Sequence, residues 1–292
     1  MTKTPEETAS PPLSPEDVRF VIDLLVEAGD IAVHMREGIT IETKSRADDL
    51  VTSADKALSD LIIKRLSERF PADLVLSEES PWQGEPTEKR RWLIDPIDGT
   101  KYYVDNSGNY CVMVGLLEGT KQVFGGFYMP VQGIALAGGV GISAVSFDKK
   151  SGTLTTIDET FPALDQGSQT GAGPDAATKA KLRVLVSDND LKANPWVKEL
   201  PEVEIRRGTS IGIDVWELRA GLADVFVHIR PTLKYWDTAA PGCVASALGM
   251  DVGTELGDEI TFAYTDPTHQ QTIVIGRKGA LAWWRQVWNS KN

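Results

Sequence analysis

Two acidic side chains lie three residues apart after an apolar run in the first half of the chain. Residues 92–100 read WLIDPIDGT, so that Asp95 ends the apolar run and Asp98 follows a proline-containing turn. Carboxylates this close repel each other, and at neutral pH they need a proton, a basic group or a divalent cation for compensation. A plain surface turn is the common alternative, but the apolar run favours a functional pair.

The next two residues, Gly99 and Thr100, are typical of the start of a short helix. The first amides of a helix are not bonded within it and are well placed to bind a phosphate. Metal-binding carboxylates beside such amides are the components of a phosphoryl-transfer site. The segment therefore predicts a place where divalent cations and a phosphate meet.

Three further acidic segments support this prediction. The apolar run at residues 74–76 leads into Glu78 and Glu79, and Asp237 follows two aromatic residues at a predicted helix start. Residues 48–55 (DDLVTSAD) place acids before another helix, where capping of that helix explains Asp55. A solvated turn or a helix cap would account for each segment alone. Their joint occurrence in this order is specific.

Together these segments resemble the inositol monophosphatase superfamily, the lithium-sensitive, Mg²⁺-dependent phosphatases, and the resemblance spans most of the chain. It implies two to three Mg²⁺ ions per active site. Glu78, Asp95 and the main-chain carbonyl of Ile97 would hold the first ion. Asp95, Asp98 and Asp237 would hold the second, with Glu78 assisting a third through water.

The resemblance also implies how a water molecule attacks the phosphate. The Thr100 hydroxyl, paired with Asp49 or Glu78, would orient and deprotonate the water, so no protein nucleophile is needed. None of the three histidines falls on a motif position, and we assign them no catalytic role. The expected substrate contacts are Gly99, Thr100, Lys101, Ser210 and Arg230.

Three positions decide between branches of the family. Lys101, directly after Asp-Gly-Thr, resembles the 3′(2′),5′-bisphosphate nucleotidases, and Arg230 suits an anionic group better than a polyol. Gly212 stands where those nucleotidases have a lysine, which points the other way. Arg230 could also pair with a structural carboxylate. We expect a small bisphosphorylated substrate such as 3′-phosphoadenosine 5′-phosphate.

Other functions remain open beside this expectation. An inositol monophosphatase or a phosphatase of inositol polyphosphates or sugar bisphosphates would use the same metal positions. A relative of another class, which binds metal or phosphate without catalysis, would also keep them. Phosphate release with and without Mg²⁺ separates the two classes.

The elements that must position these residues fall into two halves. Residues 1–13 are rich in Pro, Thr, Ser and Glu and predict a disordered tail. Residues 14–160 predict an α+β half with one large antiparallel sheet, which carries most of the metal ligands. Residues 176–292 predict an α/β half that supplies Asp237 and substrate contacts. The Gly/Ser/Gln-rich stretch at 165–175 predicts a surface loop between them.

Helices and strands were assigned from periodicity and from glycine and proline positions. Helices are expected from residue 14 to about 36, after residue 55, and at 209–220, 236–248 and 281–288. Strands are expected at 92–95, 110–117, 122–129, 133–138, 142–147, 182–187, 224–229 and 272–275. The mixed pattern indicates an α/β (α+β) fold, and the resemblance implies a layered α-β-α-β-α sandwich.

Composition excludes several other kinds of protein. The net charge of −12 disfavours nucleic acid polymers and acidic membranes as partners, but bound Mg²⁺ reverses the local field for a small phosphorylated metabolite. No apolar run is long enough for a membrane span, and the first residues have no apolar signal core. We expect Cys111 and Cys243 to be buried thiols rather than a disulfide, which suits a cytoplasmic protein. We expect the protein to be a monomer or a homodimer.

Overall fold

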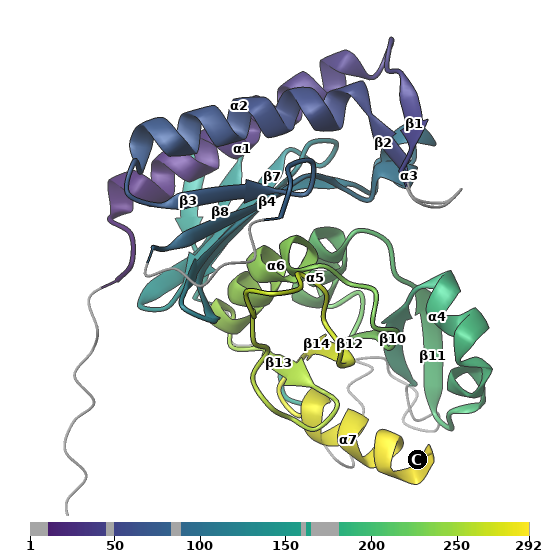
Figure 1. The fold of residues 1–292 in the computed structure, drawn as a ribbon. Coiled ribbons are helices and arrows are strands. Elements are labelled where there is room, and N and C mark those ends of the chain that lie inside the picture. The colour runs from purple at the N-terminus through teal and green to yellow at the C-terminus, as the bar shows by residue number, and fades with distance from the viewer. Residues whose placement is uncertain (1–10, 45–49, 83–88, 159–161, 165–180, 292) are drawn as a thin grey trace, which may run out of the picture.

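The computed structural model describes residues 11–44, 50–82, 89–158, 162–164 and 181–291. These residues stack in five layers of alternating helices and sheets (Figure 1). The predicted layered α-β-α-β-α sandwich is therefore confirmed. Among the sequence predictions, the catalytic candidate Asp49, the loop at 165–175 and residues 1–10 of the tail lie outside the described residues.

The first layer contains the two long helices α1 (Pro15–Met35) and α2 (Ser53–Arg69). Ser14 caps α1 in a capping box, as the sequence predicts. Helix α2 begins earlier than expected, because Thr52 is its N-cap and Asp55 is the third residue of the capping box. Leu13 is buried beneath α1, so the segment predicted as a tail is packed at its end.

The second layer is a seven-stranded sheet with the order β3-β4-β5-β6-β7-β8-β9. All neighbours are antiparallel except β3 and β4, which are parallel. The five strands predicted for this half are present, with β3 and β9 at the two edges. The strands are β3 (Leu74–Ser77), β4 (Arg91–Asp98), β5 (Cys111–Glu118), β6 (Lys121–Met129), β7 (Ile134–Gly139), β8 (Ile142–Asp148) and β9 (Thr153–Thr156).

Three small elements lie beside this sheet at the end where β4 finishes. Strands β1 (Ile41–Thr43) and β2 (Leu50–Thr52) form an antiparallel pair, and α3 (Thr100–Val104) follows β4. Figure 1 shows these elements at the same side of the molecule. The start of α2, the end of β4 and α3 therefore converge on one region.

The third layer consists of α5 (Ile211–Arg219) and α6 (Tyr235–Ala247), which pack under the large sheet. Close contact is possible because the sheet has glycines where it faces α6. A methyl group at Gly125 would lie 2.3 Å from the carbonyl oxygen of Ala240, and one at Gly115 would lie 2.6 Å from the Ala239 side chain. Only glycine fits at such approaches, and this packing holds the start of α6 close to the end of β4.

The fourth layer is a five-stranded sheet with the order β11-β10-β12-β14-β13. Strands β10, β11 and β12 are parallel, and β14 and β13 are antiparallel to their neighbours. The sequence patterns predicted β10, β12 and β14 but not β11 and β13. The strands are β10 (Leu182–Val186), β11 (Val203–Arg207), β12 (Val225–His228), β13 (Asp251–Thr254) and β14 (Ile273–Gly276).

The last layer covers the outer face of the second sheet with α4 (Asp188–Ala193), the 3₁₀ helix η1 (Pro195–Glu199) and α7 (Ala280–Lys291). Trp284 is fully buried here, stacks on Trp196 and also contacts Trp288. None of the helices in the described ranges combines the length and apolar character of a membrane span. Cys111 and Cys243 are buried free thiols, which confirms the prediction.

Candidate active site

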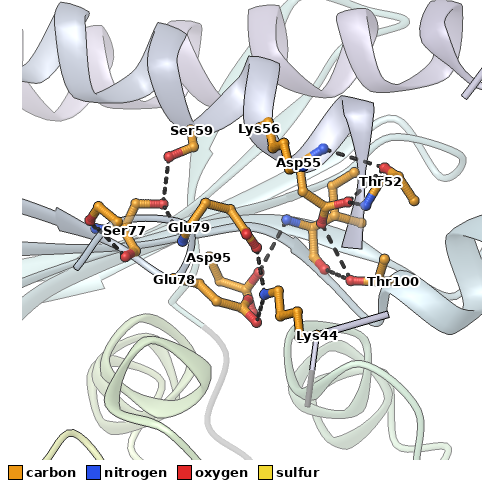
Figure 2. Close-up of polar contacts among 12 residues, drawn as sticks. Lys44, Thr52, Asp55, Lys56, Ser59, Ser77, Glu78, Glu79, Asp95 and Thr100 are labelled. Atoms are coloured by element: carbon orange, nitrogen blue, oxygen red, sulfur yellow. Dashed lines mark hydrogen bonds and ion pairs between the residues drawn. The ribbon is translucent and has the colours of Figure 1, made fainter. Parts of the chain in front are cut away.

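The parallel pairing of β3 and β4 brings the first two predicted metal ligands together. Ser77 pairs with Ile94, and the amide of Glu78 donates to the Ile94 carbonyl oxygen at 3.0 Å. Glu78 and Asp95 are therefore the next residues at the same end of two adjacent strands. Figure 2 shows their side chains beside each other. Two segments that are well separated in sequence meet because parallel strands end at one edge.

The four predicted metal carboxylates form one group of interacting charges. Burial raises the pKa of Asp95 well above its usual range, and the charges of Glu78, Asp98 and Asp237 raise it further. Burial likewise raises the pKa of Asp237, with Asp98 and Glu78 adding to the effect. The pKa of Glu78 is about 7, mainly because of burial. The fold thus gathers more negative charge than it compensates.

Lys44 supplies part of the missing compensation. Its ammonium nitrogen lies 2.7 Å from a carboxylate oxygen of Glu78 and 2.7 Å from one of Glu79 (Figure 2). Burial opposes the charge of Lys44, but Glu78 and Glu79 more than offset it and raise its pKa. Lys44 could not be identified from the sequence, because a single lysine carries no pattern of its own and its two partners lie more than thirty residues away.

The donor set fits a hard divalent cation, although its side chains are not arranged around one. In the described ranges, no three His, Cys, Asp or Glu side chains already stand in a metal-binding arrangement. Mg²⁺ prefers carboxylate oxygens, and four coupled carboxylates with raised pKa values are such donors. The residues that would hold Mg²⁺ are those predicted: Glu78, Asp95, the Ile97 carbonyl, Asp98 and Asp237.

Asp98 is fixed by the start of helix α5. One of its carboxylate oxygens accepts hydrogen bonds from the Ser210 hydroxyl at 2.5 Å and the Ile211 amide at 2.7 Å. Ser210 is fully buried and also lies 2.9 Å from the thiol sulfur of Cys111. The predicted substrate contact Ser210 therefore faces Asp98 rather than an open surface. Burial raises the pKa of Asp98, and these hydrogen bonds oppose the rise.

Asp237 lies in the first turn of α6, where its carboxylate accepts from the Lys234 amide at 2.7 Å. The sequence analysis noted that this residue could be only a helix cap. As the third residue of α6, it does help to cap the helix, by accepting from the N-cap residue Lys234. The charges of Asp98 and Glu78 also raise its pKa, so Asp237 interacts with both of them. One oxygen serves the helix, so the residue has a second oxygen for another partner.

Thr100 has a different partner from the ones predicted. Its hydroxyl oxygen lies 3.0 Å from the Ile97 carbonyl oxygen, to which it donates, and 3.4 Å from a carboxylate oxygen of Asp55. Glu78 instead pairs with Lys44, and Asp49 lies outside the described residues. Asp55 was assigned to helix capping alone. Its second oxygen performs that role by accepting from Thr52 (Figure 2), which leaves the first toward Thr100.

The turn between β4 and α3 requires glycine. Gly99 has φ of 83°, in the left-handed region, and caps α3. A methyl group there would lie 3.0 Å from the Asn109 carbonyl oxygen and 3.3 Å from the Ser210 side chain. The predicted phosphate contacts Gly99 and Thr100 are thus held beside Asp98.

The two predicted substrate cations differ in environment. Lys101 is exposed, and its side chain makes no hydrogen bond or ion pair within the described part of the chain. Arg230 lies at the end of β12, where its Nε is 3.2 Å from a carboxylate oxygen of the buried Asp190. The alternative that Arg230 pairs with a structural carboxylate is therefore observed.

Comparisons with known proteins agree with this geometry. The model of the inositol monophosphatase family matches residues 16–282. The chain is 32% identical over 247 residues to inositol-1-monophosphatase of Bacillus subtilis, covering 81% of this chain and 84% of that protein. It is 29% identical to the 3′(2′),5′-bisphosphate nucleotidase CysQ of Escherichia coli, covering 80% and 88%.

A solved structure of similar fold has much lower sequence identity. An inositol monophosphatase/NADP phosphatase crystallised with Mg²⁺ and phosphate matches with a TM-score of 0.74 and 19% identity, over 94% of this chain and 95% of that one. At this identity the match establishes the fold. The five layers described above are thus the layers of that enzyme as well.

Proposed function

The chain belongs to the inositol monophosphatase family and is a phosphoric monoester hydrolase, and we propose that it cleaves a small bisphosphorylated substrate such as 3′-phosphoadenosine 5′-phosphate. The observation that carries the proposed chemistry is the group of four interacting carboxylates, one buried and three partly buried, at the ends of β3 and β4 and the starts of α3 and α6. Such a group is compensated by divalent cations, and bound divalent cations promote the hydrolysis of phosphate esters.

We propose Mg²⁺ as the cofactor, held by Glu78, Asp95, the Ile97 carbonyl, Asp98 and Asp237. Bound there, it would offset the negative charge of the phosphate and increase the acidity of water. The protein fixes two of these ligands through helix starts, because Asp98 accepts from Ser210 and Asp237 accepts from the Lys234 amide. Ligands held in this way lose little freedom when a cation binds.

Thr100 and Asp55 are proposed to orient the attacking water and accept its proton. The support is the 3.4 Å separation between the Thr100 hydroxyl and an Asp55 carboxylate oxygen. Burial raises the pKa of Asp55, which moves it toward the range in which a general base works. The amides of Gly99 and Thr100, at the start of α3, are proposed to bind the phosphate.

A bisphosphorylated substrate is supported by chemistry at the edge of the site. The exposed Lys101 follows the phosphate-binding turn directly, and one group of curated relatives comprises bisphosphate nucleotidases. Inositol monophosphate is the second candidate, favoured by the 32% identity to the Bacillus subtilis enzyme. The free, buried thiols of Cys111 and Cys243 support a reducing compartment, for which we propose the cytoplasm.

Phosphate release from metal-free protein, before and after addition of Mg²⁺, tests the proposal. The substrates are 3′-phosphoadenosine 5′-phosphate and inositol 1-phosphate, each at several concentrations. We expect release only with Mg²⁺, inhibition by added Li⁺ but not by Na⁺, and a higher kcat/KM for the bisphosphate. A higher kcat/KM for inositol 1-phosphate would assign the chain to the inositol monophosphatases, and release that ignores Mg²⁺ would reject the metal site.

A further inference from the structure

The carboxyl ends of three parallel strands in the second sheet lead toward the proposed metal ligands. Strand β10 lies between β11 and β12, and the chain passes from β11 to β12 through α5, so strand order reverses at β10. In open α/β sheets, ligands bind outside the carboxyl ends of the strands at such a reversal. Residues 208–210, which follow β11, connect this edge to Asp98 through the Ser210 hydroxyl.

A cation and an aromatic ring lie next to residues 208–210. Arg207 is the last residue of β11, and its guanidinium carbon lies 5.7 Å from the ring centroid of Tyr102 in α3. The Tyr102 hydroxyl lies 3.4 Å from the Gly208 carbonyl oxygen. On its other side, the Tyr102 ring is so close to Gly99 that a methyl group there would lie 3.2 Å from it. Tyr102 therefore bridges the phosphate-binding turn and Arg207.

Arg207 is free to exchange its partner, whereas Arg230 is not. A terminal nitrogen of Arg207 lies 3.0 Å from a carboxylate oxygen of Asp188, and the two side chains are 53% and 54% exposed. Exposed ion pairs of this kind contribute little to stability. Arg230, in contrast, binds Asp190, whose side chain is fully buried, and separating them would leave a buried carboxylate short of a donor.

We propose that Arg207, supported by the Tyr102 ring, binds the second anionic group of the substrate, a phosphate carried on the same small molecule. A guanidinium suits this role because its planar donors match two phosphate oxygens. The incoming phosphate takes the place of the Asp188 carboxylate, and the exposed Lys101, which directly precedes Tyr102, supplies a second positive charge. This assignment rests on the proposed function of the site.

Two opposite substitutions test the assignment through KM. Arg207→Ala should raise KM for 3′-phosphoadenosine 5′-phosphate roughly 10- to 100-fold, the range expected for a lost charged hydrogen bond, and should lower the preference over inositol 1-phosphate. Asp188→Asn should lower KM for the bisphosphate, because the competing carboxylate loses its charge. Arg206→Ala is the matched control, since the neighbouring Arg206 side chain donates to the Leu222 carbonyl oxygen and should leave both KM values unchanged.

Binding measured while turnover is slowed separates the two levels of the proposal. In a Thr100→Ala background with Mg²⁺, calorimetry completed before the substrate is consumed should show weaker binding of 3′-phosphoadenosine 5′-phosphate when Arg207→Ala is added and unchanged binding when Arg206→Ala is added. Equal affinity with and without Arg207, or equal KM changes for both substrates, would overturn the Arg207 assignment alone. A native protein that releases no phosphate with Mg²⁺ would instead reject the proposed function, whatever the binding data show.

Discussion

Buried carboxylates occur in two regions of this molecule, and the protein treats them in opposite ways. Between the two sheets, Glu78, Asp95 and Asp237 have raised pKa values because burial and mutual repulsion outweigh the available partners. Beside the second sheet, Asp190 in α4 and Asp224 just before β12 have lowered pKa values although they too are buried. A negatively charged carboxylate is therefore unfavourable in one region and favourable in the other.

The difference lies in the basic side chains that face each carboxylate, because Asp98 also accepts several neutral hydrogen bonds and its pKa is still raised. Asp190 accepts from the Ser187 hydroxyl at 2.7 Å and the Arg230 amide at 3.0 Å, and it lies 3.0 Å from His228 Nδ1. Asp224 is paired with two guanidinium groups, those of Arg183 and Arg277.

The cluster between the sheets has one lysine for Glu78 and Glu79, and a few amides and hydroxyls for the rest. We propose that the incompletely compensated set at this site binds a cation, whereas the fully compensated set is structural. Substitutions in both sets can break or sharpen this contrast.

The largest effect is expected for Asp95→Asn on turnover. This change removes the most deeply buried ligand charge, so kcat should fall by about 1000-fold or more, the scale on which loss of preorganised charge acts. Steady-state phosphate release with Mg²⁺ measures it. Circular dichroism should report an intact fold, and unchanged turnover would rule out Asp95 as a metal ligand.

The opposite result is expected for Asp190→Asn. This substitution removes a compensated charge and leaves His228 and Arg230 without their buried partner, so it should destabilise the fold by about 3 kcal/mol. Urea unfolding measures the change. Asp224→Asn is the parallel case in the same sheet, and stability equal to the native protein in both variants would remove the distinction between the two regions.

A smaller effect is expected for Thr100→Ala. Loss of the hydroxyl that faces Asp55 should lower kcat by roughly 10- to 100-fold, within the range for general acid–base groups, with little change in KM. Steady-state kinetics with Mg²⁺ provide both constants. If KM rises as much as kcat falls, Thr100 is a binding residue and Asp55 has no part in activating water.

The smallest effect is a change of metal-free stability with pH. The pKa of Glu78 is about 7 in the folded protein, above the value of about 4.3 for an unperturbed glutamate. At Glu78 the folded protein therefore binds more protons between these values, so the contribution of this residue to the free energy of unfolding should decrease as pH rises from about 4 to 7. Melting curves in EDTA of the native protein and Glu78→Gln measure this contribution as the difference between their two pH profiles. A native-minus-variant difference that increases across this interval would contradict the raised pKa.

Much of the fold could be predicted from local patterns. Helix α1 with its Ser14 cap and the strands that became β4 to β8 have clear periodicity or punctuation. Strands β11 and β13 were missed because Val203–Arg207 mixes apolar and charged residues and β13 has a glycine in its interior. Their strand conformation is decided by pairing with β10 and β14, which no local window contains.

The sequence predicted the acidic residues that the fold brings together, but it predicted fewer of the groups that support them. Asp95 and Asp98 are recognisable from one short segment, and the structure confirms that Glu78 lies beside Asp95. Asp55 was underestimated because its role as a helix cap is real and concealed a second one. Lys44 and the Asp190–Arg230 pair depend on contacts between distant segments, which sequence spacing does not show.

The contrast between the two regions is tested most directly by the melting temperatures of the native protein and Asp95→Asn, in EDTA and then with Mg²⁺. In EDTA the variant should melt at or above the native temperature, because one uncompensated charge is gone. Mg²⁺ should then raise the melting temperature of the native protein by several degrees and that of the variant much less, since a ligand that binds only the folded state stabilises it. A variant that melts lower than the native protein in EDTA, with equal responses of both proteins to Mg²⁺, would contradict the account.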